Sequence, residues 1–173
     1  MFAAALKRLL LAACLLTASQ AIGAELALPD PKLRYADFPT EIYRGRTAEL
    51  IVEGEYMEAY QDNYRVALNR KTIVAGHHAL VLLPCGSTCV APDLVNLKTG
   101  KSLKVPFNVS GWRKYNDGFK PVLARADSRL IVFQGGRNEK NPVGRHYYVV
   151  ENGELQHLHT TDTDGDFRKP PKL

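Results

Sequence analysis

Two of the three cysteines of the chain, Cys85 and Cys89, are separated by three residues and lie between two strand-like apolar runs. Such a pair can be a redox couple, half of a metal site, or a disulfide that closes a hairpin loop. Thiol–disulfide oxidoreductases use a Cys-x-x-Cys pair at a helix N-terminus, where the dipole lowers the pKa of the attacking thiol. Here the spacing is one residue longer and the setting is a hairpin, so the pattern favours a structural disulfide. The residues between the cysteines, Gly86, Ser87 and Thr88, would then form an exposed recognition loop.

Histidines near the cysteine pair and downstream of it make zinc the metal to consider. His77 and His78 are adjacent, and adjacent strand residues point to opposite faces, so we do not expect them in one site. His157 and His159 are expected to share a face, but no third and fourth ligands stand at a recognisable spacing. The sequence therefore predicts neither a metal site nor a cofactor.

Patterns for catalysis are weak throughout the chain. The stretch TDTDGD at 161–166 resembles the start of a calcium loop, but Phe167 and Leu173 stand where that loop needs Gly and Glu. No G-x-S-x-G is present, and no serine lies in a frame typical of a nucleophile. Acids are sparse in the strand-like runs, where Asp93 is the main exception, so a carboxylate pair for glycoside chemistry is not indicated. We predict no catalytic residue.

Residues 1–24 have the layout of a secretory signal peptide, with Lys7 and Arg8, an apolar run, and small residues through Ala24. The apolar run is too short to cross a bilayer as a helix, so we expect no transmembrane span after the leader is removed. The predicted location is the periplasm or the exterior of the cell, where disulfides persist. An alternative is that residues 11–14 form a lipobox and that Cys14 is lipidated.

Removal of the leader leaves roughly 150 residues, enough for a single domain with one core. Because the leader carries two basic residues and no acid, the formal charge falls from +5 to +3. The remaining basic residues are interleaved with acids and do not alternate with aromatic residues, as a nucleic-acid groove would require. We therefore expect no nucleic-acid partner.

The part of the mature chain before residue 70 is expected to hold an extended segment and one helix. Residues 25–48 contain three prolines and no sustained period, which indicates an extended segment laid over the domain. Four residues then recur at four-residue spacing, which predicts a helix that packs one stripe on a sheet: Tyr56, Tyr60, Tyr64 and Leu68.

After residue 70 the chain reads as β-structure, because runs rich in Val, Leu, Ile and aromatic residues alternate with turn signals. The pair Asn152-Gly153 is the strongest hairpin signal. Short connections rule out parallel crossovers, so the predicted fold is α+β, with one N-terminal helix packed on a mainly antiparallel hairpin meander of about seven strands. We place the domain at 25–160 and a polar, mobile tail at 161–173. The expected strands lie within 72–84, 90–97, 102–109, 119–126, 129–136, 145–151 and 154–160.

The order of these features resembles a widespread type of small exported bacterial protein. Such proteins carry a Gly-His strand, here Gly76-His77, a CG(T/S)xC loop, here residues 85–89, and a TGK turn, here residues 99–101. The likeness covers roughly residues 60–158. It implies export and this fold, and it implies no particular activity.

These features favour an exported, non-catalytic binding module, such as an inhibitor or immunity-type partner of another envelope protein. One alternative is an enzyme that uses the cysteine loop or the histidines on a thiol or cell-wall substrate. A second alternative is a structural accessory protein. The sequence indicates no oligomeric state.

Overall fold

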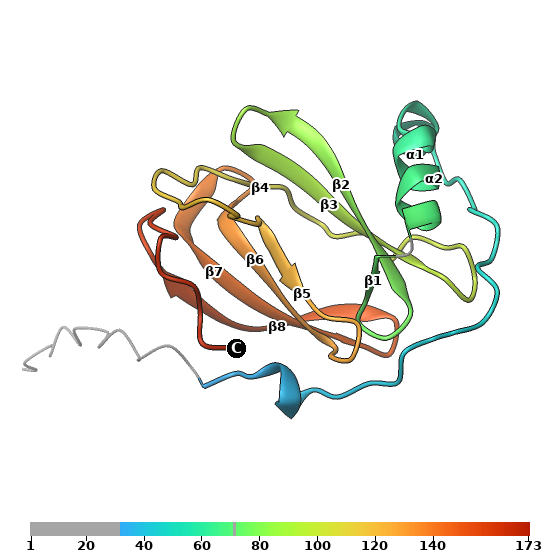
Figure 1. Cartoon of the computed structure of the whole chain (residues 1–173). Helices are drawn as coiled ribbons and strands as arrows, with labels where there is room; N and C mark the ends of the chain where they lie inside the picture. The colour runs from blue at the N-terminus through green and yellow to red at the C-terminus, as the bar shows by residue number, and fades with distance from the viewer. Residues whose placement is uncertain (1–31, 71) are drawn as a thin grey trace, which may run out of the picture.

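A computed structural model describes residues 32–70 and 72–173 of the 173-residue chain. The expected leader, with Cys14, lies outside these residues. The described chain forms a mostly antiparallel eight-stranded sheet and two short helices, which agrees with the broad α+β class (Figure 1). The strands pair in the order β1-β2-β3-β4-β6-β7-β8, and β5 pairs with β6. The elements are α1 (Glu55–Ala59), α2 (Gln61–Arg70), β1 (Ile73–Val74), β2 (His78–Gly86), β3 (Cys89–Asn96), β4 (Val109–Ser110), β5 (Val122–Ala124), β6 (Leu130–Arg137), β7 (Lys140–Glu151) and β8 (Glu154–Asp162).

Tight turns join the long strands into hairpins. Asn152 and Gly153 connect β7 to β8 with φ angles of 51° and 77°. Positive φ at both central residues gives a turn whose twist matches that of the flanking strands, which is why Asn-Gly is favoured there. The hairpin expected at this pair is confirmed.

The strand expected over 72–84 is interrupted by a turn. Ala75 and Gly76 adopt φ angles of 46° and 79° and separate β1 from β2. The turn is held from outside, because the amide N–H groups of these residues donate to the carbonyl oxygens of Arg125 and Ala126, each at 2.9 Å. The run expected at 102–109 is mostly irregular, since only its last residue belongs to β4.

The sheet bends so that β2–β3 and β6–β8 form two leaves with a shared apolar core (Figure 1). Large side chains of this core, such as Leu94 on one leaf and Phe133 on the other, are fully buried. Each contributes roughly 1.5–3 kcal/mol relative to an exposed position. The buried members of this cluster are Val74, Ala75, Leu94, Phe107, Val109, Val122, Ile131, Phe133, Tyr148 and Val150.

The helices cover the outer face of β2–β3, where Tyr64 and Leu68 of α2 pack on Val81 and Leu83. The prediction of one N-terminal helix is met only in part, because the described residues hold two helices, which begin at residue 55 and precede the first strand. The break falls at Tyr60, whose φ of −112° is not helical. The predicted stripe is therefore only partly buried, and its first member at position 56 is 54% exposed.

Segments before and after the sheet pack on the outer face of β6–β7. Within residues 32–48, the described part of the segment expected to be extended, the chain forms no α-helix and no strand and has one 3-10 turn, η1 (Tyr35–Asp37). Phe38 and Leu173, from opposite ends of the described chain, contact the same apolar cluster as Leu130 and Tyr147. The domain boundary predicted at residue 160 falls inside β8, and Phe167 of the polar tail is only 3% exposed.

Candidate functional site

The two cysteines form a disulfide at the tip of the β2–β3 hairpin, as predicted. Cys89 opens β3 and lies opposite Gly86 at the end of β2. The φ of Gly86 is 148°, a conformation that L side chains rarely adopt, so the glycine permits the tight closure. Ser87 and Thr88 form the exposed turn between the strands.

The disulfide tip borders a surface hollow of about 400 Å³. Cys89 pairs with Ser110 of β4, and the amide of Gly111 donates to the carbonyl oxygen of Thr88 at 3.1 Å. The other wall comes from the β6–β7 hairpin, through Gly136, Glu139 and Val143. Two hairpin tips that are distant in sequence therefore enclose one concave surface.

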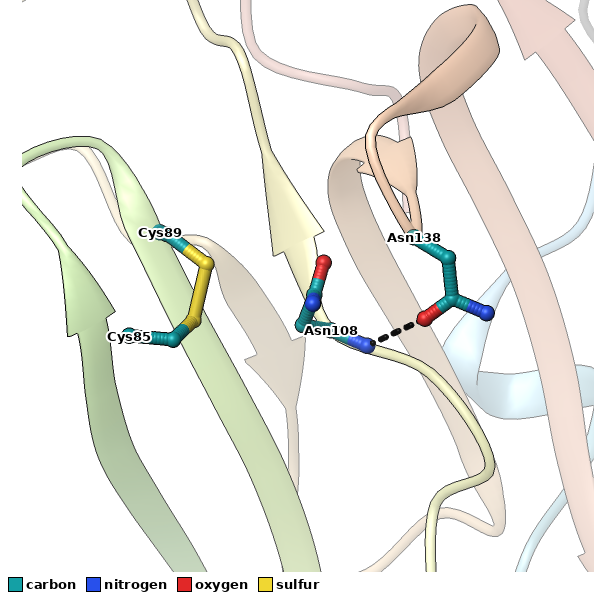
Figure 2. Close-up of a disulfide and its surroundings, with 4 residues drawn as sticks. All are labelled: Cys85, Cys89, Asn108 and Asn138. Carbon is teal, nitrogen blue, oxygen red and sulfur yellow. Dashed lines mark hydrogen bonds between the residues drawn. A yellow bond between two sulfur atoms is a disulfide. The ribbon is translucent and has the colours of Figure 1, made fainter.

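Asn108 lies between the disulfide and Asn138 of the β6–β7 turn (Figure 2). The two asparagines are joined twice: the amide N–H of Asn108 donates to Oδ1 of Asn138, and the amide N–H of Asn138 donates to the carbonyl oxygen of Asn108, both at 3.1 Å. The side-chain Oδ1 of Asn108 is buried and accepts no hydrogen bond from the described residues. This reciprocal pair ties the segment before β4 to the β6–β7 turn, and β4 in turn pairs with β3 beside the disulfide.

His77 and His78 lie side by side, with ring centroids 4.4 Å apart, contrary to the expectation that they face opposite ways. The alternation rule does not apply because His77 belongs to the turn that precedes β2. Burial, with smaller contributions from the adjacent His77 and from Lys98, lowers the pKa of His78 to about 4. Burial also lowers the pKa of His77.

His157 and His159 do not share a face, so that prediction is wrong. A bulge in β8 sets His157 opposite Tyr148 and His159 opposite Tyr147, and these two tyrosines are adjacent on β7. The extra residue, Leu158, reverses the alternation. The two imidazoles accordingly contact different tyrosine rings, at 5.0 Å and 6.2 Å between centroids.

His146 is fully buried and uses both ring nitrogens. Its Nε2 lies 2.7 Å from the carbonyl oxygen of Gly135, and its Nδ1 lies 2.9 Å from Oγ1 of Thr160. A carbonyl can only accept, so Nε2 carries the hydrogen and Thr160 donates to Nδ1. Thr160 in turn accepts from Nε2 of His157 at 2.8 Å. These histidines are thus hydrogen-bonded into the sheet, and burial lowers the pKa of His146 to about 4.

Asp93 is a buried polar centre that the sequence analysis noted without assigning it a role. It is 7% exposed, and it accepts hydrogen bonds from the Tyr64 hydroxyl at 2.7 Å and from the Ser102 hydroxyl at 2.7 and 2.8 Å. The backbone amides of Leu94 and Lys104 also donate to it, at 2.7 and 3.1 Å. In the sequence, the signal for such a network is a single acidic residue within an apolar strand-like run.

The acidic side chains within 161–166 form hydrogen bonds and ion pairs in and beside the turn that follows β8. Oδ1 of Asp162 accepts from the amide of Asp164 at 2.8 Å, and Asp164 forms an ion pair with Arg113. Arg168 donates to Asp166 and lowers the pKa of that carboxyl to about 2. Across residues 32–70 and 72–173, no group of three or more His, Cys, Asp or Glu side chains is arranged to hold a metal ion.

Two further findings bear on function. No helix in the described part of the chain has the length and apolarity needed to cross a membrane. Comparison with protein-family models, with curated proteins and with solved structures gives no significant match. The proposals below therefore depend on the sequence and on the geometry of the chain itself.

Proposed function

We propose that this protein is an exported, non-catalytic binding module that recognises another envelope protein through its disulfide tip. The observation that supports this most directly is the hollow of about 400 Å³ beside the tip. Its rim is preorganised, because the Cys85–Cys89 bond closes one hairpin and the Asn108–Asn138 pair holds the other. A rigid rim binds a partner without a large entropic cost of ordering.

The chemistry of the rim suits a polar segment of a protein partner. Ser87 and Thr88 are exposed and offer hydroxyl groups, and the exposed Glu139 on the facing hairpin supplies a negative charge. The exposed glycines at positions 86 and 111 have no side chain that would keep a close-fitting chain away from the backbone. An inhibitor or immunity-type protein would use such a surface.

Export is part of the proposal. The disulfide is compatible with an oxidising compartment. The signal-peptide layout of residues 1–24 adds a route to the periplasm or to the exterior, and lipidation of Cys14 is the alternative form of export.

A site-specific photocrosslinking experiment tests the recognition surface. A photoreactive phenylalanine analogue is placed at Ser87, and a matched protein carries the analogue at Thr99, an exposed turn residue at the opposite end of β3. We expect one stoichiometric adduct with an envelope protein from position 87 and none from position 99. Equal adducts at both positions, or no adduct at position 87, would contradict the proposal.

Opening the disulfide provides a second readout with the isolated partner. The variant Cys85→Ser/Cys89→Ser lacks the disulfide, so its loop is more flexible. Binding must then order the loop at an entropic cost. We expect affinity to fall at least tenfold while the fold is retained, measured by calorimetry beside a Thr99→Ala control, an exposed position remote from the hollow. Unchanged affinity would exclude the tip from recognition.

A further inference from the structure

A second hollow, of about 330 Å³, lies at the opposite end of β2 from the disulfide tip. At about 3.3 Å per residue, the nine residues of β2 place it roughly 25 Å from the tip. Its polar lining comes from three regions: the N-terminal segment through Thr40, the start of β2 through His77 and His78, and the β7–β8 turn through Asn152. Asn96 at the end of β3 and the charged side chains of Arg129 and Glu151 complete this lining.

The histidine side of the hollow is rigid. Ala75 adopts a left-handed φ of 46°, which is costly for a residue other than glycine, and it is only 2% exposed. Its carbonyl oxygen accepts from the amide of His77 at 2.9 Å. The amide of Tyr43 donates to Gly76 at 2.8 Å, and the amide of Leu97 donates to His77 at 2.8 Å. Bonds to separate segments thus hold the strained turn in place.

His78 presents one nitrogen to the hollow as an acceptor. The ring is 2% exposed, and its Nδ1 lies 3.3 Å from the carbonyl oxygen of Ala75. Because the carbonyl can only accept, Nδ1 carries the hydrogen and Nε2 carries the lone pair. No residue of the described ranges donates to Nε2. Nε2 is not among the fully buried atoms that lack a partner, so it keeps contact with solvent and a ligand hydroxyl can donate to it.

The hollow has donors as well as this acceptor, and its charges cancel. Oδ1 of Asn96 already accepts from the amide of Lys98 at 2.9 Å, which leaves the Nδ2 group of Asn96 to donate. Arg129 and Glu151 pair with each other at 2.7 Å. The lowered pKa values of both histidines keep the rings neutral near pH 7.

We propose that this hollow is a binding site for a neutral polyhydroxylated ligand, of the size of a monosaccharide unit. His78 Nε2 accepts a hydroxyl hydrogen, the Asn96 amide donates to a hydroxyl oxygen, and the half-buried ring of His77 offers an aromatic surface to the C–H face of the sugar. Uncharged donors and acceptors beside an ion pair whose charges cancel match a neutral ligand better than an anion or a cation.

Titration with defined sugars tests the site. The protein, with its disulfide intact, is titrated with D-glucose and with N-acetyl-D-glucosamine while the imidazole signals of His77 and His78 are followed by NMR. Inorganic phosphate at equal concentration is the charged comparator. We expect saturable shifts of both rings with at least one sugar, at millimolar Kd, and none with phosphate.

Substitutions in the lining distinguish binding in this hollow from effects on the whole protein. Asn152→Gly removes one lining side chain while a Gly-Gly turn remains compatible with the hairpin, and His77→Ala removes the aromatic surface. We expect each to raise the sugar Kd at least fivefold, and Ser87→Ala at the distant disulfide tip to leave it unchanged. The proposal is overturned if neither sugar shifts the rings, if phosphate shifts them instead, or if the lining variants bind as tightly as the Ser87→Ala control.

Discussion

The Asp93 carboxylate ties two other parts of the chain to one point on β3. Tyr64 reaches it from α2, and Ser102 and Lys104 reach it from the chain after β3. A buried charge is costly unless its lone pairs are occupied, and here hydroxyl and amide donors occupy them. The carboxylate therefore sets the position of the helix on the sheet as well as contributing to stability.

Replacement of the tyrosine hydroxyl tests this anchor. Tyr64→Phe removes one donor and leaves a buried carboxylate oxygen underbonded, which costs about 1–3 kcal/mol of unfolding free energy. The measurement is the denaturant concentration at the midpoint of unfolding, compared between variants whose unfolding free energy depends on denaturant with the same slope. Tyr56→Phe is the matched control because that ring is 54% exposed. Equal midpoints for the two variants would show that the hydroxyl contributes nothing.

Two buried histidines predict how stability depends on pH. Burial lowers the pKa of His78 and of His146 to about 4 in the folded protein, below the ordinary value of 6.5. The unfolded chain therefore binds more protons than the folded chain between these values, so protonation favours unfolding. We expect the unfolding free energy to be fully present above about pH 6.5 and to fall as the pH approaches 4, by roughly 3 kcal/mol for each histidine.

Urea unfolding at a series of pH values between 7.5 and about 5.5, above the usual carboxylate range, measures this slope. The ring signals of His146 should not titrate in the folded protein over the same interval. A flat stability profile, or a His146 signal that titrates near its ordinary pKa, would contradict the prediction.

At the scale of elements, the turn after β3 is shaped by the extended N-terminal segment. Gly100 has a φ of 76°, and a Cβ there would lie 1.8 Å from the carbonyl oxygen of Glu49. The amide of Ile51 also donates to the carbonyl oxygen of Gly100 at 2.9 Å. The close approach of the two backbones requires glycine at this position.

Two glycine substitutions separate the clash from the conformational strain. Gly100→Ala and Gly118→Ala both force alanine into a positive φ, but a Cβ at Gly118 meets nothing within 4 Å. We expect Gly118→Ala to cost about 1 kcal/mol and Gly100→Ala to cost at least about 2 kcal/mol more, by thermal or chemical unfolding. Similar losses for both would show that the N-terminal segment does not pack tightly on this turn.

Local sequence patterns predict the hairpins and the disulfide because both depend on neighbouring residues. Asn152-Gly153 specifies its own turn, and the short spacing of Cys85 and Cys89 suits closure of a loop. The faces of the C-terminal histidines depend instead on the bulge at Leu158, which arises from pairing with β7. The turn at Ala75 is likewise set by bonds to distant segments. Positions fixed by tertiary partners have no local signal.

The same limit applies to the candidate sites. The cysteine loop could be found from its spacing, but the hollow beside it needs Glu139 and Val143 from a hairpin fifty residues later. The His77–His78 hollow likewise needs Asn152 from the β7–β8 turn. Only the bent sheet brings these residues together.

At the scale of the whole molecule, both ends of the described chain pack on the sheet. The C-terminal segment folds back so that the amide of Phe167 donates to the carbonyl oxygen of Lys114 at 2.7 Å. The ring of Phe167 lies 5.6 Å from that of Phe119 and 5.7 Å from the guanidinium of Arg145. Trp112, the only tryptophan of the chain, contacts Phe119 at 5.3 Å.

Removal of this aromatic anchor should release the C-terminal segment. Phe167→Ala deletes a ring that is only 3% exposed, and truncation of a buried Phe costs about 3–5 kcal/mol. We expect lower thermal stability, a changed emission of Trp112, and tryptic cleavage at Arg168 under native conditions. Lys172→Ala, an exposed change in the same segment, is the control. If both variants resist cleavage equally and share one emission spectrum, Phe167 does not hold the segment on the sheet.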